Sequence, residues 1–270
     1  MVSFPPCKIN LGLNIIGKRS DGYHDIATGF YPVQRTDVLD IVPAKDFSFA
    51  VSGDLIPGAA VDNLCVRAYH LLKKDFSLKP VAIHLLKCIP IGAGLGGGSA
   101  DGAYTLRALN QIFDLAISRE KMVVYAAQLG SDCAFFIENK PMIGTGRGEV
   151  LSALDVTLKG KYLVIVRPEV QILTATAYAG VVPHDPGADL RDVLERHPMR
   201  EWRHLLKNDF EATLFPQFPI IEALLQKLYA LGAIYASMSG SGSAVFGIFE
   251  NATNLEKEFE SYDYWSGFLD

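Results

Sequence analysis

The chain has 270 residues, of which 49% are hydrophobic and 20% charged, so it can fill a packed core and is not disordered throughout. Its 25 basic and 30 acidic residues give a net charge of −5, which argues against broad electrostatic binding of nucleic acid or an anionic membrane. Four scattered cysteines without a CxxC pair, and no apolar run of bilayer length, predict a reduced, cytoplasmic protein.

In the first half of the chain, predicted strands alternate with predicted helices. Alternating and β-branched residues indicate strands at residues 9–16, 38–42, 47–51 and 81–86. Apolar residues at helical spacing indicate helices at 63–76, at 120–129 and directly after a glycine run at 92–98. The glycine run is therefore expected between the end of a strand and the start of a helix.

The second half mixes strands, helices and glycine-rich turns. Because they follow one another without strict βαβ repetition, the pattern favours an α+β fold. The best domain boundary lies near residues 150–160, which predicts an N-terminal domain over 1–155 and a C-terminal domain over 156–270. The elements expected here are a strand at 162–166, a loop at 182–187, a helix at 219–231, strands at 234–238 and 244–249 around a turn at 239–243, and a short polar helix at 255–262 that ends the chain.

The most informative stretch is PIGAGLGGGSADGA at 90–103, with six glycines in eleven residues. Glycine lets the backbone approach a ligand closely, and the exposed N–H groups at a helix N-terminus attract phosphate. Ser99 is expected at or near the start of the following helix, where its hydroxyl can bond a backbone N–H, a phosphate oxygen or a metal ion. The stretch therefore favours a phosphate-binding loop.

Other interpretations of this loop fit less well. Gly92-x-Gly94-x-x-Gly97 matches the dinucleotide fingerprint, but the region where a second strand and its acidic residue should follow continues a helix instead. No lysine precedes Ser99, so the Walker A pattern also fails. A flexible surface loop is disfavoured, because such a glycine run weakens folding unless its backbone freedom is used.

Further motifs accompany the glycine run in chain order. They are Pro6-Cys7-Lys8-Ile9-Asn10-Leu11, Asp21-Gly22-Tyr23-His24, Gly94-Leu95-Gly96-Gly97-Gly98-Ser99, Gly130-Ser131-Asp132-x-x-Phe135-Phe136, Gly146-x-Gly148-Glu149 and Ser239-Gly240-Ser241-Gly242-Ser243. The set spans most of the chain and resembles the GHMP kinases. Within them it is most similar to the family of 4-diphosphocytidyl-2-C-methyl-D-erythritol kinases, which act in the non-mevalonate isoprenoid pathway.

The resemblance implies a two-domain architecture, with an N-terminal domain like ribosomal S5 domain 2 and a ferredoxin-like C-terminal domain. It implies transfer of the γ-phosphoryl group of ATP to the 2-hydroxyl of the cytidine diphosphate-linked polyol, with Mg²⁺ as cofactor. Another GHMP small-molecule kinase, of mevalonate or homoserine type, and a non-catalytic nucleotide-binding sensor remain alternatives. A binding-only sensor would not need to keep Lys8, Asp132 and Ser99 intact.

The resemblance also assigns a catalytic pair and a nucleotide site. Asp132 would accept or orient the hydroxyl proton, while Lys8 would keep Asp132 ionised and stabilise the transferring phosphoryl group. Ser99 is the expected protein contact for Mg²⁺, and dispersed histidines and cysteines give no sign of a metal held by protein alone. The residues implied to bind ATP are Pro90, Gly92, Gly94, Leu95, Gly96, Gly97, Gly98, Ser99, Ala100 and Asn63.

The residues implied to hold the cytidine end of the substrate are Asn10, Tyr23, His24, Thr174 and Tyr178. Tyr23 and Tyr178 would sandwich the base, and His24 would hydrogen-bond its polar edge. Structural interpretations stay open beside these: a strand-edge polar residue for Asn10, a tyrosine packed beneath a hairpin for Tyr23 and a surface position for His24. Likewise, Asn63 suits a helix N-cap, and the turn at 239–243, implied to support the phosphate loop, also suits a plain hairpin.

Overall fold

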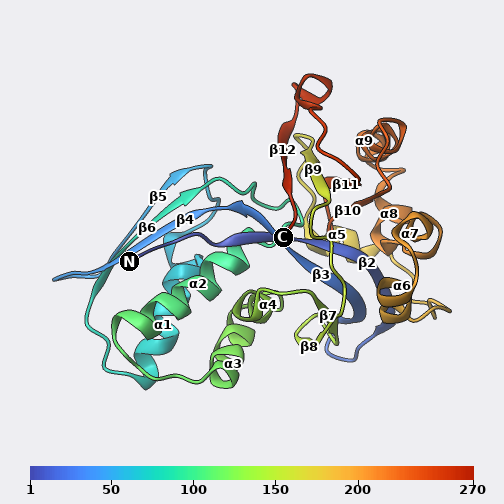
Figure 1. Ribbon diagram of the computed structural model, residues 1–270. Helices are drawn as coiled ribbons and strands as arrows, with labels where there is room; N and C mark the ends of the chain where they lie inside the picture. The colour runs from blue at the N-terminus through green and yellow to red at the C-terminus, as the bar shows by residue number, and fades with distance from the viewer. The chain divides into compact units, whose positions relative to one another are not determined.

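A computed structural model describes residues 1–270, and the chain forms two compact units that are each assembled from three segments (Figure 1). Unit 1 comprises Met1–Lys8, Arg35–Ile91 and Gly96–Lys140. Unit 2 comprises Ile9–Gln34, Gly92–Leu95 and Pro141–Asp270. The chain therefore passes between the units after Lys8, Gln34, Ile91, Leu95 and Lys140. The boundary near residue 155 stays a prediction.

Unit 1 is built on a four-stranded sheet in the order β1-β4-β6-β5. Its strands are β1 (Val2–Ser3), β4 (Val38–Pro43), β5 (Ser48–Gly53) and β6 (Val81–Lys87). The pairs are antiparallel except β5 with β6, which run parallel because helix α1 (Leu64–Asp75) joins them. In β6 the buried residues alternate with more exposed ones, so the period-two pattern of the sequence is the pattern of burial.

The helices of unit 1 cover one face of this sheet, as Figure 1 shows for α1 and α2. Leu39, Ile83 and Leu85 of the sheet pack with Tyr69 of α1 and Leu106 of α2 in one buried cluster. The start of α2 directly follows the glycine run, as expected. The remaining helical elements of unit 1 are the 3₁₀ turn η1 (Ala60–Asp62), α2 (Gly97–Ile112), α3 (Arg119–Leu129) and α4 (Cys133–Glu138).

Unit 2 contains most of a second four-stranded sheet, in the order β2-β3-β7-β8. Its strands are β2 (Pro6–Lys18), β3 (His24–Thr36), β7 (Met142–Thr145) and β8 (Val150–Ala153). Strands β3 and β7 pair antiparallel from Thr28↔Gly144 to Phe30↔Met142. The residues between β7 and β8 form a turn, and the Ile26 N–H donates to the Gly146 carbonyl at 2.7 Å. That bond ties the β7–β8 turn to the start of β3.

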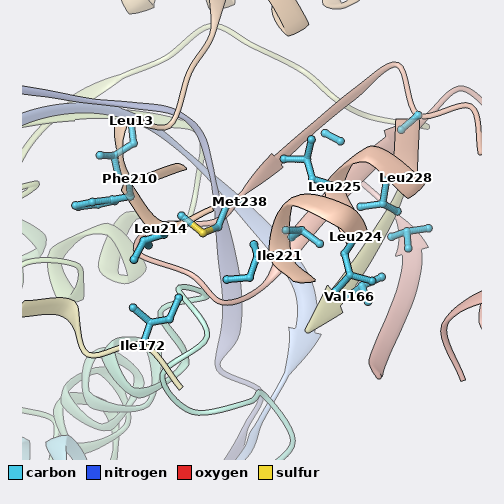
Figure 2. Packing of buried hydrophobic residues seen from close by; sticks show 14 of the residues in the cluster. Leu13, Val166, Ile172, Phe210, Leu214, Ile221, Leu224, Leu225, Leu228 and Met238 are labelled. Atoms are coloured by element: carbon cyan, nitrogen blue, oxygen red, sulfur yellow. The ribbon is translucent and has the colours of Figure 1, made fainter. Parts of the chain in front are cut away.

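A third sheet, entirely antiparallel and ordered β10-β11-β9-β12, also belongs to unit 2. Apolar side chains of helix α9, among them Leu224 and Leu228, point into the core of this unit beside Val166 of β9 (Figure 2). The elements of this part are β9 (Tyr162–Arg167), α5 (Thr174–Ala179), α6 (Leu190–Arg196), α7 (Met199–Leu205), α8 (Asp209–Leu214), α9 (Pro219–Ala230), β10 (Tyr235–Met238), β11 (Val245–Phe249), the 3₁₀ turn η2 (Glu256–Phe259) and β12 (Asp263–Phe268).

The end of the chain differs from the prediction. A helix over 255–262 was expected to end it, but only η2 is helical there, and the chain ends in strand β12. The pairing of β12 with β9, from Asp263↔Arg167 to Phe268↔Tyr162, supplies its hydrogen bonds. A partner strand about a hundred positions away in the chain leaves no periodic signal in the local sequence.

Candidate active site

In unit 1, Lys8 and Asp132 come together although 123 residues of chain lie between them. Lys8 lies on β2 and is 3% exposed, and its Nζ is 3.5 Å from Oδ2 of Asp132. Asp132 occupies the N-cap position of α4, and about a third of its side chain (32%) is exposed. The expectation that this ammonium and this carboxylate meet is confirmed, and Asp132 keeps part of its side chain exposed.

Burial lowers the pKa of Lys8, because removing an ammonium from water disfavours its charged form. The charge of Asp132 and its hydrogen bond with Lys8 act in the opposite direction. Asp132 therefore favours the charged form of Lys8, which burial disfavours.

The N-terminal end of helix α2 packs against the Lys8 side chain. Gly96 is the N-cap of α2 with a φ of +73°, a conformation that favours glycine. A Cβ atom at this position would lie 3.2 Å from Cε of Lys8 and 3.0 Å from Cζ of Phe136. A Cβ atom at Gly98 would meet nothing within 4 Å. The start of α2 therefore packs against Lys8 and Phe136 at Gly96 and has open space at Gly98.

Ser99 extends the same cluster. It lies in the first turn of α2, is half-buried, and lies near the thiol of Cys133, the residue next to Asp132, where it lowers the pKa of that thiol. Burial outweighs this effect and raises the pKa of Cys133 to about 12, so the thiol is a packing group rather than a nucleophile. Lys8, Gly96, Ser99 and Asp132 are thus brought together at the starts of two helices.

The oxygen donors near this cluster suit a hard cation. The Ser99 hydroxyl is an oxygen donor of the type that Mg²⁺ accepts, and Mg²⁺ commonly takes one or two protein ligands plus substrate phosphates. No group of three or more His, Cys, Asp or Glu side chains is placed to hold a metal ion. The residues present therefore fit a Mg²⁺ ion that arrives with a nucleotide.

A buried cluster of charged side chains at the start of α2 was not predicted from the sequence. Lys87 Nζ lies 2.5 Å from Asp37 Oδ2 and 2.9 Å from Asp101 Oδ2, and all three side chains are almost fully buried. A Cβ atom at Gly97 would lie 3.2 Å from the same Nζ. Asp37 lies 50 residues and Asp101 14 residues from Lys87 in the chain, and neither separation is a recognisable spacing motif. Through Lys87, the cluster packs against Gly97 in the first turn of α2.

In unit 2, the first half of the glycine run is fastened to the turn at 239–243. Gly94 has a φ of +77°, and a Cβ atom there would fall 1.9 Å from the Ser239 carbonyl oxygen, so only glycine fits. The Ser239 hydroxyl donates to the Gly94 carbonyl at 3.0 Å, and the Ala244 N–H donates to the Ala93 carbonyl at 3.1 Å. The turn contacts the glycine run as the resemblance implied.

The other residues expected to bind ATP have mixed exposure. Gly92 has a φ of +66°, is exposed, and has open space around it. Pro90, Leu95 and Ala100 are buried and can only act through their backbone or by packing. The Asn63 Oδ1 accepts a hydrogen bond from the Cys65 N–H at 2.9 Å and so caps α1, the structural interpretation that the sequence left open.

Two aromatic rings expected at the cytidine end are in contact with each other. In unit 2 the rings of His24 and Tyr178 stack with centroids 5.0 Å apart and an interplanar angle of 23°. Phe210 meets the Tyr178 ring edge-on at 4.8 Å. Thr174 begins α5, and its hydroxyl lies 3.5 Å from that of Ser241. His24, Thr174 and Tyr178 are therefore held by contacts of their own.

Asn10 is 2% exposed, and its side chain already has hydrogen-bonding partners. Its Nδ2 donates to Thr28 Oγ1 at 2.8 Å, and its Oδ1 accepts from the Ser239 hydroxyl at 3.5 Å. The Thr28 hydroxyl in turn donates to the Gly12 carbonyl at 2.6 Å. Asn10 thus connects β2 to the turn that supports the glycine run, and its contact with a substrate stays a prediction.

Tyr23 is 55% exposed, and the guanidinium of Arg147 lies over its ring at 4.9 Å from the centroid. Arg147 belongs to the β7–β8 turn, for which no side-chain role was predicted. A lone arginine between two glycines gives no signal of this contact, which depends on the pairing of β3 with β7.

Comparison with known proteins gives consistent results. Residues 63–140 match the family described as GHMP kinases N terminal domain, and residues 190–263 match GHMP kinases C terminal. A 4-diphosphocytidyl-2-C-methyl-D-erythritol kinase of Bacteroides fragilis is 49% identical over 266 residues, with 97% of each chain covered. The same kinase of Cytophaga hutchinsonii is 46% identical, covering 95% of this chain and 98% of its own.

The chain belongs to the 4-diphosphocytidyl-2-C-methyl-D-erythritol kinase family. A crystal structure of a 4-(cytidine 5'-diphospho)-2C-methyl-D-erythritol kinase agrees, with a TM-score of 0.84, 30% identity, and coverage of 100% of this chain and 99% of the other. The protein is thus a kinase with the GHMP fold, as predicted. None of its helices has the length and apolar character that crossing a lipid bilayer requires.

Proposed function

We propose that this kinase transfers the γ-phosphoryl group of ATP to the 2-hydroxyl of 4-diphosphocytidyl-2-C-methyl-D-erythritol, the substrate named for its relatives. The observation that carries the proposal is the Lys8–Asp132 pair at 3.5 Å beneath the N-terminus of α2. A phosphoryl-transfer enzyme chiefly needs positioned reactants and stabilised negative charge, and this arrangement offers a base, a cation and aligned N–H groups.

In the proposed reaction, Asp132 accepts the proton of the substrate 2-hydroxyl. The hydroxyl oxygen attacks the γ-phosphorus of ATP, a new P–O bond forms, and the bond to the β,γ-bridging oxygen breaks, with its electron pair leaving on ADP. Lys8 supports ionised Asp132 and stabilises charge on the transferring group. Because Lys8 is buried, little water competes for its ammonium, and its charge acts more strongly on the reacting atoms.

The nucleotide phosphates would bind at the start of α2. The N–H groups of its first turn are unpaired within the helix, and the helix dipole favours an anion there. Gly98 leaves space for a phosphate oxygen, while Gly96 brings the backbone close to Lys8. Ser99 would hold Mg²⁺ together with the phosphates, and the ion would offset their negative charge when bound.

The cytidine end would bind in unit 2 near Tyr23, His24 and Tyr178, with Thr174 and Asn10 as polar neighbours. Aromatic rings offer apolar faces for a base, and His24 offers ring nitrogens for its polar edge. A cytoplasmic location, and the absence of nucleic-acid and membrane partners, stay predictions alongside this substrate.

The test is an ADP-release assay on purified protein with four acceptors: the cytidine diphosphate-linked methylerythritol, mevalonate, homoserine and galactose. We expect turnover with the first acceptor only, and phosphorus NMR should place the new phosphate on the 2-hydroxyl. Turnover with mevalonate or homoserine would replace the proposed substrate. Nucleotide binding without turnover of any acceptor would favour the sensor alternative.

A further inference from the structure

Tyr23 lies at the tip of a hairpin, and its backbone is fixed by the turn before it. The Tyr23 N–H donates to Asp21 Oδ1 at 3.1 Å, and Asp21 pairs with Arg19. The Tyr23 ring itself is 55% exposed. An exposed ring on a short turn can rotate about its side-chain bonds unless another group restrains it. A ring that is to stack on the base therefore needs a neighbouring group that restricts its rotation.

Arg147 is placed to restrict the rotation of the Tyr23 ring. Its guanidinium lies 4.9 Å from the centroid of the Tyr23 ring. Glu149 fixes Arg147 by two contacts, since its carboxylate accepts from the Arg147 backbone N–H at 2.6 Å and from Nε at 3.4 Å. The β7–β8 turn that contains Arg147 is joined to β3, because the Ile26 N–H donates to the Gly146 carbonyl. The guanidinium is thus anchored in a turn that is hydrogen-bonded to β3, the strand that begins directly after Tyr23.

We propose that Arg147 is a positioning residue for the pyrimidine end of the substrate: it covers one face of the Tyr23 ring and leaves the opposite face to stack on the base. The inference rests on the proposed function, because it requires a substrate that carries a cytosine. A cation over one ring face is attracted by the ring quadrupole, which restricts the ring without occupying the other face. Arg147 would act on binding and not on the chemical step.

The test compares Arg147→Leu with Arg147→Lys in steady-state assays with the cytidine substrate. We expect the leucine variant to raise the KM for this substrate about three- to fivefold, the range that an exposed cation–π contact supports, with kcat and the KM for ATP unchanged. The lysine variant keeps a cation and should restore most of the affinity. Arg203→Leu removes a similar contact, 4.8 Å from the Tyr229 ring, and should change none of these constants.

A double-variant cycle separates this role from a direct contact with the substrate. In a Tyr23→Leu background, Arg147→Leu should have no further effect on KM, because Arg147 acts through the ring. An equal rise of KM in both backgrounds, or no rise in either, would overturn the inference. If the unmodified protein does not turn over the cytidine substrate, the proposed function fails instead, and the two failures remain distinguishable.

Discussion

Asp132 allows the proposed base to be tested at the level of a single residue. Asp132→Asn keeps the shape of the side chain but cannot accept a proton. We expect kcat to fall by about 10²- to 10⁴-fold while ATP binding measured by calorimetry is retained, and the free energy of unfolding to fall as well, because buried Lys8 loses its paired charge. Asp46→Asn, at an exposed turn of unit 1, is the matched control. Normal turnover by Asp132→Asn would show that another group is the base.

The buried cluster of Lys87, Asp37 and Asp101 makes a second prediction. Asp37 accepts hydrogen bonds from Lys87 and from the N–H groups of Cys88 and Ile89, whereas Oδ1 of Asp101 is buried without a hydrogen-bond partner. Asp37→Asn should therefore lower the free energy of unfolding by about 3 kcal/mol at pH 5, and Asp101→Asn by about 1 kcal/mol or less. Urea unfolding measures both, and the opposite order would contradict this account of the cluster.

The same cluster should make stability depend on pH. Burial, and then the charge of Asp37, raise the pKa of Asp101 to about 7, although Lys87 opposes the shift. The folded protein then holds a proton on Asp101 that the unfolded chain has released above about pH 4. The free energy of unfolding should therefore fall as pH rises from 5 to 8, and fall less in Asp101→Asn. Parallel curves for the two proteins would show that Asp101 is ionised throughout.

Sequence reasoning found the residues that belong to contiguous motifs and missed those that only the fold assembles. Lys8, Asp132 and Ser99 lie in short motifs by which the chain resembles the GHMP kinases, and the structure brings Lys8 and Asp132 together. Arg147 and Lys87 have no motif of their own. Their partners are set by strand pairing and helix packing, which a local pattern does not encode.

At the level of elements, the glycines of the run at 92–98 are of two kinds: some pack tightly against their neighbours, and others have open space around them. Gly94→Ala would place a methyl group 1.9 Å from the Ser239 carbonyl in a left-handed conformation, and we expect it to lower the free energy of unfolding by roughly 2 kcal/mol or more.

Gly98→Ala should behave in the opposite way. Nothing lies within 4 Å of the added methyl group, and alanine favours the helix, so stability should stay the same or rise by up to about 1 kcal/mol. The KM for ATP should rise by roughly tenfold, because the methyl group takes the space of a phosphate oxygen. Thermal unfolding and kinetics of both variants check this contrast. An unchanged KM for ATP would place the phosphates elsewhere.

The strongly periodic elements were predicted well, and the short ones were not. The helices over 63–76 and 219–231 agree with α1 and α9 within a residue or two, because each buries one apolar stripe. Helices α5 to α8 have six or seven residues, too few for a helical period to stand out. Strand β12 and much of β3 depend on partners that are distant in the chain.

At the level of the whole molecule, the chain passes between the two units five times, and strands β2 and β3 continue from one unit into the other. We therefore expect one cooperative unfolding transition. Leu85→Ala in unit 1 and Leu228→Ala in unit 2, both at fully buried positions, should each lower the free energy of unfolding by about 2–5 kcal/mol.

The two tryptophans make this testable, because Trp202 and Trp265 both belong to unit 2. Leu85→Ala should shift the midpoint of the tryptophan fluorescence transition by as much as it shifts the circular dichroism transition. If Leu85→Ala leaves the midpoint of the fluorescence transition unchanged, the two units unfold independently of each other.

The first turn of α2 has a consequence for inhibitors. A compound that mimics phosphate at Gly96–Ser99 would be recognised mainly by main-chain N–H groups, which amino-acid replacements leave in place. A single replacement could then cause drug resistance only if its side chain occupied the space in which the compound binds. Only Gly98 has room for such a side chain, because Gly96 and Gly97 are crowded by their neighbours. If the nucleotide phosphates bind here as proposed, a replacement at Gly98 that excludes the compound would also obstruct ATP, so a resistant variant would lose activity.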